Sequence, residues 1–151
     1  MSSALNRPEL ATALGHAFRD PALLERALTH PSYAHEHPPT RHNEVLAFLG
    51  DAVLGLVVAE LLHARAPDDA PGPLTRQRAE LVSARNLAIW AERLGLPDHL
   101  RLGRGEAQGG GGRKESVLAS AIEAVIGAVY LDGGLDPARA LISRLMDDGP
   151  T

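Results

Sequence analysis

The chain has 151 residues, of which 44% are hydrophobic and 23% charged, which is typical of a globular protein large enough for one domain with a sizeable core. Its net charge of −4 argues against a protein that holds nucleic acid by bulk electrostatic attraction alone. The absence of cysteine excludes disulfides and thiolate metal sites, and the longest apolar run, residues 52–59, is far shorter than the roughly 20 residues of a membrane span.

Helical periodicity runs along nearly the whole chain, and no alternating strand pattern interrupts it. Asp20 and Pro21 predict the start of a helix, as its N-cap and first helical residue. A Pro- and His-rich connector over residues 30–42 then leads to a long helix over about residues 43–63. The apolar positions predicted to form the buried side of this long helix are Leu46, Leu49, Val53, Leu56, Val57 and Leu61.

Two shorter helices are predicted after a loop over residues 64–73. Thr75 and Ser83 are the expected N-caps of these helices, and Gly95 is expected to end the second. Trp90 lies on the apolar side of the second helix, which favours a place in the core over a role in stacking on bases.

The last third of the chain is predicted to contain a flexible loop and two helices. The loop is the glycine-rich stretch 103–113, and a second long helix follows over about residues 115–132 until two glycines at 133–134 stop it. An Asp-Pro pair at 136–137 opens the last helix. The fold class predicted for residues 1–151 is therefore a single all-α domain.

Small residues on the two long helices predict that these helices pack closely. Gly50 and Gly55 lie inside the first, and an interior glycine costs up to about 1 kcal/mol relative to alanine. A close approach of two backbones offsets that cost, and it would bring Glu44 and Asp51 of the first helix towards Glu123 of the second. Acids on tightly packed helices are costly unless they are paired or bind a cation. On spacing alone, a metal site and buried ion pairs both explain them.

The segment HNEVLAFLGDAVL, residues 42–54, resembles the signature of the ribonuclease III family, which is usually close to HNERLEFLGDAVL. Three further segments resemble family motifs in the family's order: RALTHPSYAHEH, GPLTRQRAELVSARNLAIWAERLGL and LRLGRGEAQGGGGRKESVLASAIEAVIGAVYLDGG. The resemblance covers about residues 23–134. It implies an all-helical endonuclease domain, normally a two-fold homodimer, that binds double-stranded RNA in a groove across the interface. It also implies phosphodiester hydrolysis with magnesium, or manganese, held by carboxylates.

Three acids of the family pattern are retained in this chain, as Glu44, Asp51 and Glu123. The resemblance implies that Asp51 and Glu123 occupy catalytic positions and that all three acids are candidate metal ligands. Hard divalent cations such as Mg²⁺ require oxygen ligands of this kind.

Three other positions that hold acids in the family are occupied here by Ala47, Pro71 and Ser120. The family's main magnesium site is made by the residues that match Ala47, Asp51, Ser120 and Glu123, so half of its direct ligands are missing. Losing two negative charges beside a dication is expected to cost several kcal/mol of binding free energy, on the order given by screened Coulomb attraction. We therefore expect weak magnesium binding and weak or lost cleavage. The alternatives are an active endoribonuclease that uses the retained acids and a non-catalytic dimeric scaffold in RNA processing or ribosome assembly.

The partners implied by the resemblance are double-stranded RNA and a second copy of the chain. Candidate RNA contacts are basic residues outside the predicted core, although solvated surface charge explains them equally well: Arg76, Arg78, Arg104, Arg113 and Lys114. We expect these 151 residues to lack the C-terminal double-stranded RNA-binding domain that family members usually add, either because that domain has been removed or because the protein is a nuclease domain alone. We therefore expect weak, salt-dependent RNA binding, and a cytoplasmic protein with no membrane partner.

Overall fold

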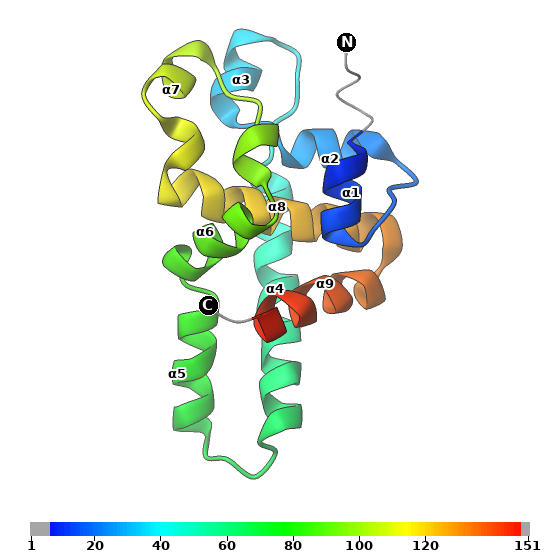
Figure 1. The fold of residues 1–151 in the computed structure, drawn as a ribbon, viewed down its shortest axis with the longest axis vertical. Helices are drawn as coiled ribbons and strands as arrows, with labels where there is room; N and C mark the ends of the chain where they lie inside the picture. Colours follow the sequence, from blue (N-terminus) through cyan, green and yellow to red (C-terminus); the bar gives the residue numbers. More distant parts are fainter. Residues whose placement is uncertain (1–6, 149–151) are drawn as a thin grey trace.

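The structure is a computed structural model that describes residues 7–148. Those residues form helices without any strand, which confirms the all-α prediction (Figure 1). The α-helices are α1 (Pro8–Leu14), α2 (Pro21–Ala27), α3 (Pro31–Glu36), α4 (Glu44–Arg65), α5 (Pro71–Leu81), α6 (Ala84–Arg93), α7 (Arg104–Gln108), α8 (Glu115–Gly133) and α9 (Leu135–Asp148). Two short 3₁₀ helices, η1 (Leu96–His99) and η2 (Gly111–Arg113), flank α7.

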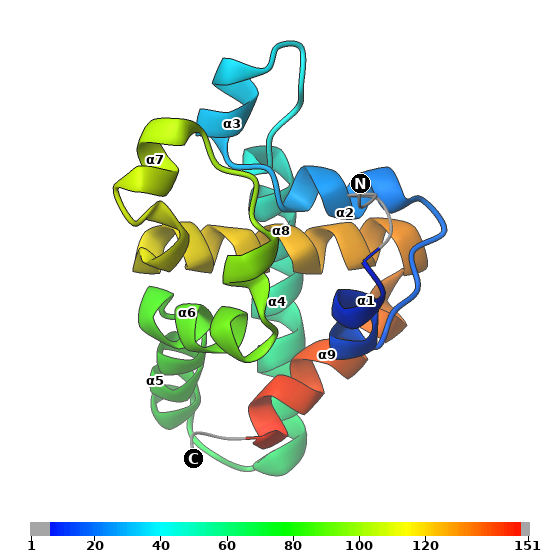
Figure 2. The same cartoon turned by 45° about the horizontal axis from the view of Figure 1, so that its top comes forward.

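The two long helices α4 and α8 cross at the centre of the molecule (Figures 1 and 2). A Cβ atom on Gly50 would overlap the carbonyl oxygen of Glu123, and a Cβ atom on Gly127 would overlap the carbonyl oxygen of Leu46. The two backbones are therefore in direct contact at the crossing, as the small residues of both helices predict. Only glycine permits this approach at these two positions.

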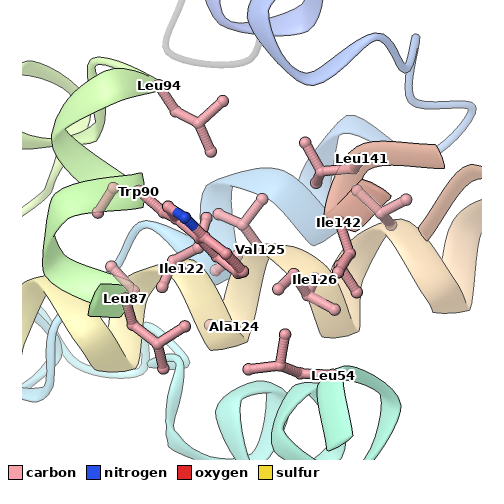
Figure 3. Packing of buried hydrophobic residues seen from close by; sticks show 14 of the residues in the cluster. Leu54, Leu87, Trp90, Leu94, Ile122, Ala124, Val125, Ile126, Leu141 and Ile142 are labelled. Carbon is pink, nitrogen blue, oxygen red and sulfur yellow. The ribbon is translucent and has the colours of Figure 1, made fainter. Parts of the chain in front are cut away.

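The main core lies on the side of α8 that faces α6 and α9. Figure 3 shows the indole of Trp90 against α8, close to Ile122 and Val125, with Leu54 of α4 and Leu141 of α9 nearby. Trp90 is only 2% exposed, so its predicted place in the core is confirmed. Packing against α4, α6 and α9 holds α8 in place, and with it the backbone of Glu123.

The short helices were not predicted, and they depend on contacts between distant segments. The predicted connector contains α3, and the predicted glycine-rich loop contains α7. The carboxylate of Glu36 accepts a hydrogen bond from the backbone N–H of Arg104 at 2.9 Å, and the hydroxyl of Ser32 accepts one from the N–H of Gly103 at 2.8 Å. These bonds join both ends of α3 to the start of α7, and no periodicity within either segment reveals them.

Helix α1 is also absent from the sequence prediction, and the segment after it is attached to α8. The carboxylate of Asp132 accepts hydrogen bonds from the backbone N–H groups of Arg19 and Asp20, each at 2.9 Å, and pairs with His16 at 2.8 Å. Burial opposes ionisation of Asp132, but these bonds lower the pKa of its carboxyl below the ordinary value. The loop between α1 and α2 is thus fixed to the end of α8 by one carboxylate.

The predicted helix caps are confirmed at two positions and wrong at a third. The Asp20 carboxylate accepts a hydrogen bond from the N–H of Ala22, and the Ser83 hydroxyl accepts one from the N–H of Asn86. Thr75, in contrast, lies inside α5, because that helix already begins at Pro71, where proline suits the first turn. The last helix likewise begins one residue before the predicted Asp-Pro pair.

One face of the α4–α8 pair is apolar and uncovered in the single chain. Val45 is 63% exposed, Phe48 81%, Leu56 52% and Leu131 53%, so the prediction that Leu56 is buried is wrong for one chain. These side chains are called the apolar face below. A recess of about 600 Å³ opens beside them. Its lining residues are Leu49, Ala52, Val53, Leu56, Tyr130, Leu131, Gly134 and Leu135.

Among the described residues, α4 and α8 are also long and apolar enough to cross a membrane by length and composition. Core helices of globular domains meet the same two criteria. Because α4 and α8 pack against each other and against α6 and α9, their place in the core already explains their composition.

Candidate active site

Asp51 and Glu123 meet where α4 crosses α8. Asp51 follows Gly50 in the chain, and the backbone of Glu123 lies directly against that glycine. Burial, a side-chain hydrogen bond with Asp51 and the negative charge of Asp51 raise the pKa of the Glu123 carboxyl to about 7. The contact that places the two helices side by side therefore also forces the two carboxyl groups together.

The pair is accessible from outside, since Asp51 is exposed and Glu123 is only partly buried. Two carboxylates this close repel each other when both are ionised, and below about pH 7 a shared proton relieves the repulsion. A divalent cation would relieve it at higher pH and would find oxygen ligands on both helices. The chemistry of the pair thus suits a cation.

The positions next to the pair supply no further carboxylate. Ala47 lies one turn before Asp51 on α4, and Ser120 lies one turn before Glu123 on α8. They contribute a methyl group and a neutral hydroxyl. Within residues 7–148, no group of three or more His, Asp and Glu side chains is arranged to hold a metal ion. The residues present therefore fit a magnesium ion only in part.

The structure does not bring Glu44 to the pair, contrary to the expectation from sequence. Glu44 is the first residue of α4 and is exposed, and its carboxylate lies 3.9 Å from the imidazole of His42. Seven residues separate it from Asp51, which corresponds to about 10 Å along a helix axis. Glu44 is thus too far along α4 to share a direct ligand position with Asp51.

Pro71 is also remote from the pair. It begins α5, which runs beside the far half of α4 (Figure 1). There it lines a recess of about 250 Å³ together with apolar residues and the polar side chains of His63, Asp69, Thr75 and Arg78. The position that holds an acid in the family therefore contributes nothing to the site within a single chain.

The candidate RNA contacts fall into two exposed groups. Arg76 and Arg78 lie on α5, whereas Arg104, Arg113 and Lys114 lie around α7 and the start of α8. The Lys114 ammonium pairs with the carboxylate of Glu106 at 2.8 Å. This ion pair offsets part of the positive charge of the second group.

His30 lies near the same ion pair and caps α3. Its imidazole Nδ1 accepts a hydrogen bond from the N–H of Ser32 at the start of α3. Burial lowers the pKa of His30, although the charges of Glu106 and Glu44 oppose that shift. Glu106, which pairs with Lys114 near His30, lies in the segment predicted to be a flexible loop and is not among the predicted site residues.

Residues 20–148 match the Ribonuclease-III-like family. The chain belongs to this family. Its sequence is 52% identical over 151 residues to Ribonuclease 3 of Heliobacterium modesticaldum, covering 98% of this chain and 64% of that protein. It is 53% identical over 134 residues to Ribonuclease 3 of Symbiobacterium thermophilum, covering 89% of this chain and 57% of that protein. The chain thus spans about three-fifths of the length of these curated relatives.

Solved structures of the ribonuclease III family share the fold. A nuclease domain of ribonuclease III from Campylobacter jejuni superposes with a TM-score of 0.88 at 40% identity, covering 95% of this chain and 97% of that one. The description of that structure refers to structural flexibility in a region involved in dimer formation. Dicer from Pichia stipitis matches with a TM-score of 0.62 at 26% identity, covering 86% of this chain and 55% of that one. The predicted ribonuclease III nuclease-domain fold is therefore confirmed.

Proposed function

We propose that this chain is a ribonuclease-III-like domain that binds double-stranded RNA in RNA processing and whose metal-dependent cleavage is weak or lost. The observation that supports this most directly is the Asp51–Glu123 pair with Ala47 and Ser120 beside it. The family membership supports the RNA substrate, and the incomplete set of acids supports the impairment.

The impairment follows from ligand chemistry. Magnesium exchanges its tightly bound waters only for a favourable set of oxygen ligands, usually several of them charged. Asp51 and Glu123 are the two groups here that would hold the ion, and the chemistry it supplies to the family is activation of a water and neutralisation of charge on the phosphate. With a methyl and a hydroxyl in place of two carboxylates, the ion is held by about half of the usual charge.

We further propose that the functional unit is a homodimer joined through the apolar face. Phe48, Val45, Leu56 and Leu131 expose large apolar side chains on one side of the domain, and such a patch is typical of an interface. The Campylobacter jejuni relative, whose description refers to dimer formation, supports the same assembly. Two copies would offer a duplex a longer surface than one, with recognition through the shape and phosphates of the minor groove.

An active endoribonuclease is the second candidate. The retained pair of carboxylates favours it, because water molecules and the RNA phosphate can fill empty positions around a metal ion. A dimeric scaffold that binds no RNA is the third candidate, and it would be consistent with the negative net charge of the chain.

A cleavage assay separates these three functions. Long duplex RNA is incubated with the purified protein and millimolar Mg²⁺ or Mn²⁺, beside an Asp51→Asn variant purified in the same way. The proposed function predicts no fragments, or only slow ones, together with a band shift of the duplex at low salt when EDTA is present. Rapid metal-dependent cleavage that Asp51→Asn abolishes would establish the active enzyme, and the absence of a band shift would favour the scaffold.

A further inference from the structure

A second polar recess lies apart from the carboxylate pair, between α2 and the connector that leads to α4. Its volume is about 440 Å³. Its lining residues are Asp20, Ala22, Leu23, Glu25, Arg26, Thr40, Arg41 and Arg101. Three arginines thus share one opening, and neither the family acids nor the candidate RNA contacts are among the lining residues.

Two of these arginines, Arg26 and Arg41, lie close enough for their positive charges to repel each other. The Arg26 guanidinium donates one hydrogen bond from Nε to the carbonyl oxygen of His42 at 3.0 Å. Burial and the nearby positive charge of Arg41 lower the pKa of Arg26. Arg41 is exposed and makes no hydrogen bond or ion pair with any residue in 7–148. The terminal nitrogens of both side chains are therefore available to an anion.

The third arginine is held in place by its neighbours. Arg101 donates from Nε to the hydroxyl of Thr29 at 3.0 Å, and its guanidinium lies 4.6 Å from the centre of the Tyr33 ring. These contacts fix the plane of the guanidinium and leave its terminal nitrogens without a hydrogen bond to the described residues. A fixed guanidinium recognises phosphate at a lower entropic cost than a mobile one.

The two acids of the recess offset only part of this positive charge. The Glu25 carboxylate accepts hydrogen bonds from Arg7 at 2.6 and 3.1 Å, and its other contact is with Arg101, whose Nε lies 3.8 Å from one of its oxygens. Asp20 accepts the N–H of Ala22 as the cap of α2. Together with Arg7, four guanidinium groups accompany two carboxylates, so the recess keeps an excess of positive charge.

We propose that this recess binds a phosphate group, either one of the RNA backbone or that of a small phosphate compound. Guanidinium groups match the geometry of phosphate oxygens and bind them through charge-assisted hydrogen bonds. The backbone source rests on the proposed function. The recess borders the connector that leads into α4, the helix that carries Asp51.

Inorganic phosphate is the direct probe of the recess. Thermal unfolding of the protein is followed in a phosphate titration at constant ionic strength, beside Arg41→Glu, Arg41→Lys and Arg85→Glu. Arg85 is an exposed arginine at the start of α6, so its reversal makes the same charge change away from the recess. The wild type and Arg85→Glu should be stabilised by phosphate, Arg41→Lys partly, and Arg41→Glu should bind at least about tenfold more weakly. Equal responses of Arg41→Glu and Arg85→Glu, or no response of the wild type, would overturn the proposal.

Binding of a short RNA duplex in EDTA then identifies the source of the phosphate. A loss of about tenfold in affinity for Arg41→Glu, with a smaller loss for Arg85→Glu, assigns the recess to the RNA backbone. Equal affinities of the two variants, with the phosphate response intact, assign it to a small phosphate compound. If the wild type binds no duplex, the proposed function fails, and the phosphate titration still shows whether the recess binds phosphate.

Discussion

Glu123 is the residue whose titration reports on the candidate site. Its pKa is raised to about 7, well above the ordinary value near 4.5, so the folded chain retains a proton that the unfolded chain releases. Between about pH 4.5 and 7 the folded state therefore binds more protons, and the stability of the domain must fall as the pH rises through this window. After burial, the hydrogen bond with Asp51 and the repulsion by its charge are the further causes of the raised pKa of Glu123.

Asp51→Asn should consequently stabilise the metal-free domain at pH 8, where the wild type carries two ionised carboxylates side by side. The expected gain is on the order of 1 kcal/mol, because solvent screens part of the repulsion. At pH 5 Glu123 is protonated in the wild type, so the two proteins should be about equally stable. Urea denaturation in EDTA at both pH values measures this difference. A gain that is the same at pH 5 and pH 8 would mean that the two carboxyl groups are not coupled.

Sequence reasoning predicts this pair but not the place of Glu44. Asp51 and Glu123 can be paired from the sequence because each adjoins a small residue that lets the helices touch. Glu44 matches a family acid, yet the rise of the helix carries it two turns away from Asp51. Charges that depend on tertiary contacts, such as Arg26 beside Arg41, have no signal in a linear pattern.

At the scale of elements, the crossing of α4 and α8 depends on glycine at one point of contact. Gly50→Ala should destabilise the domain by more than about 3 kcal/mol, because the new methyl overlaps the backbone of Glu123 and α8 cannot move without disturbing its core.

Gly55 provides a matched control in the same helix. Apart from the local backbone of α4, no atom lies within 4 Å of a Cβ placed there, so Gly55→Ala should stabilise α4 by up to about 1 kcal/mol. Urea denaturation of both variants compares them. Similar effects of the two substitutions would show that helix propensity, rather than close packing, governs the crossing.

The long elements of this fold are predictable from sequence, and the short ones are not. The helices α4 and α8 each contain several turns of apolar periodicity, which is enough to identify them before any contact is known. The helices α3 and α7 have only 6 and 5 residues, which is too short for a period to be established. They are held together by two hydrogen bonds: the Ser32 hydroxyl accepts one from the backbone N–H of Gly103, and the Glu36 carboxylate accepts one from the N–H of Arg104, the first residue of α7.

At the scale of the whole molecule, the exposed apolar face indicates that two copies of the domain associate through it. Phe48→Glu should dissociate the proposed homodimer, since Phe48 is 81% exposed in one chain and a charge there would be buried without a partner in the dimer. Ile89→Glu is the control, because Ile89 is 41% exposed on α6 and is not part of the apolar face. Sedimentation equilibrium should give a dimer for the wild type and Ile89→Glu and a monomer for Phe48→Glu. A monomeric wild type, or a dimer that survives Phe48→Glu, would contradict the proposed interface.

The central claim is that two carboxylates are too few to hold magnesium firmly at the crossing of α4 and α8. Calorimetric titration with Mg²⁺ and Mn²⁺ of the wild type and of the double variant Ala47→Glu/Ser120→Asp tests it most directly. The double variant should bind both ions at least about 100-fold more tightly, a gain of roughly 2.7 kcal/mol, while the wild type binds them weakly. Equal, tight binding of magnesium by both proteins would contradict the claim.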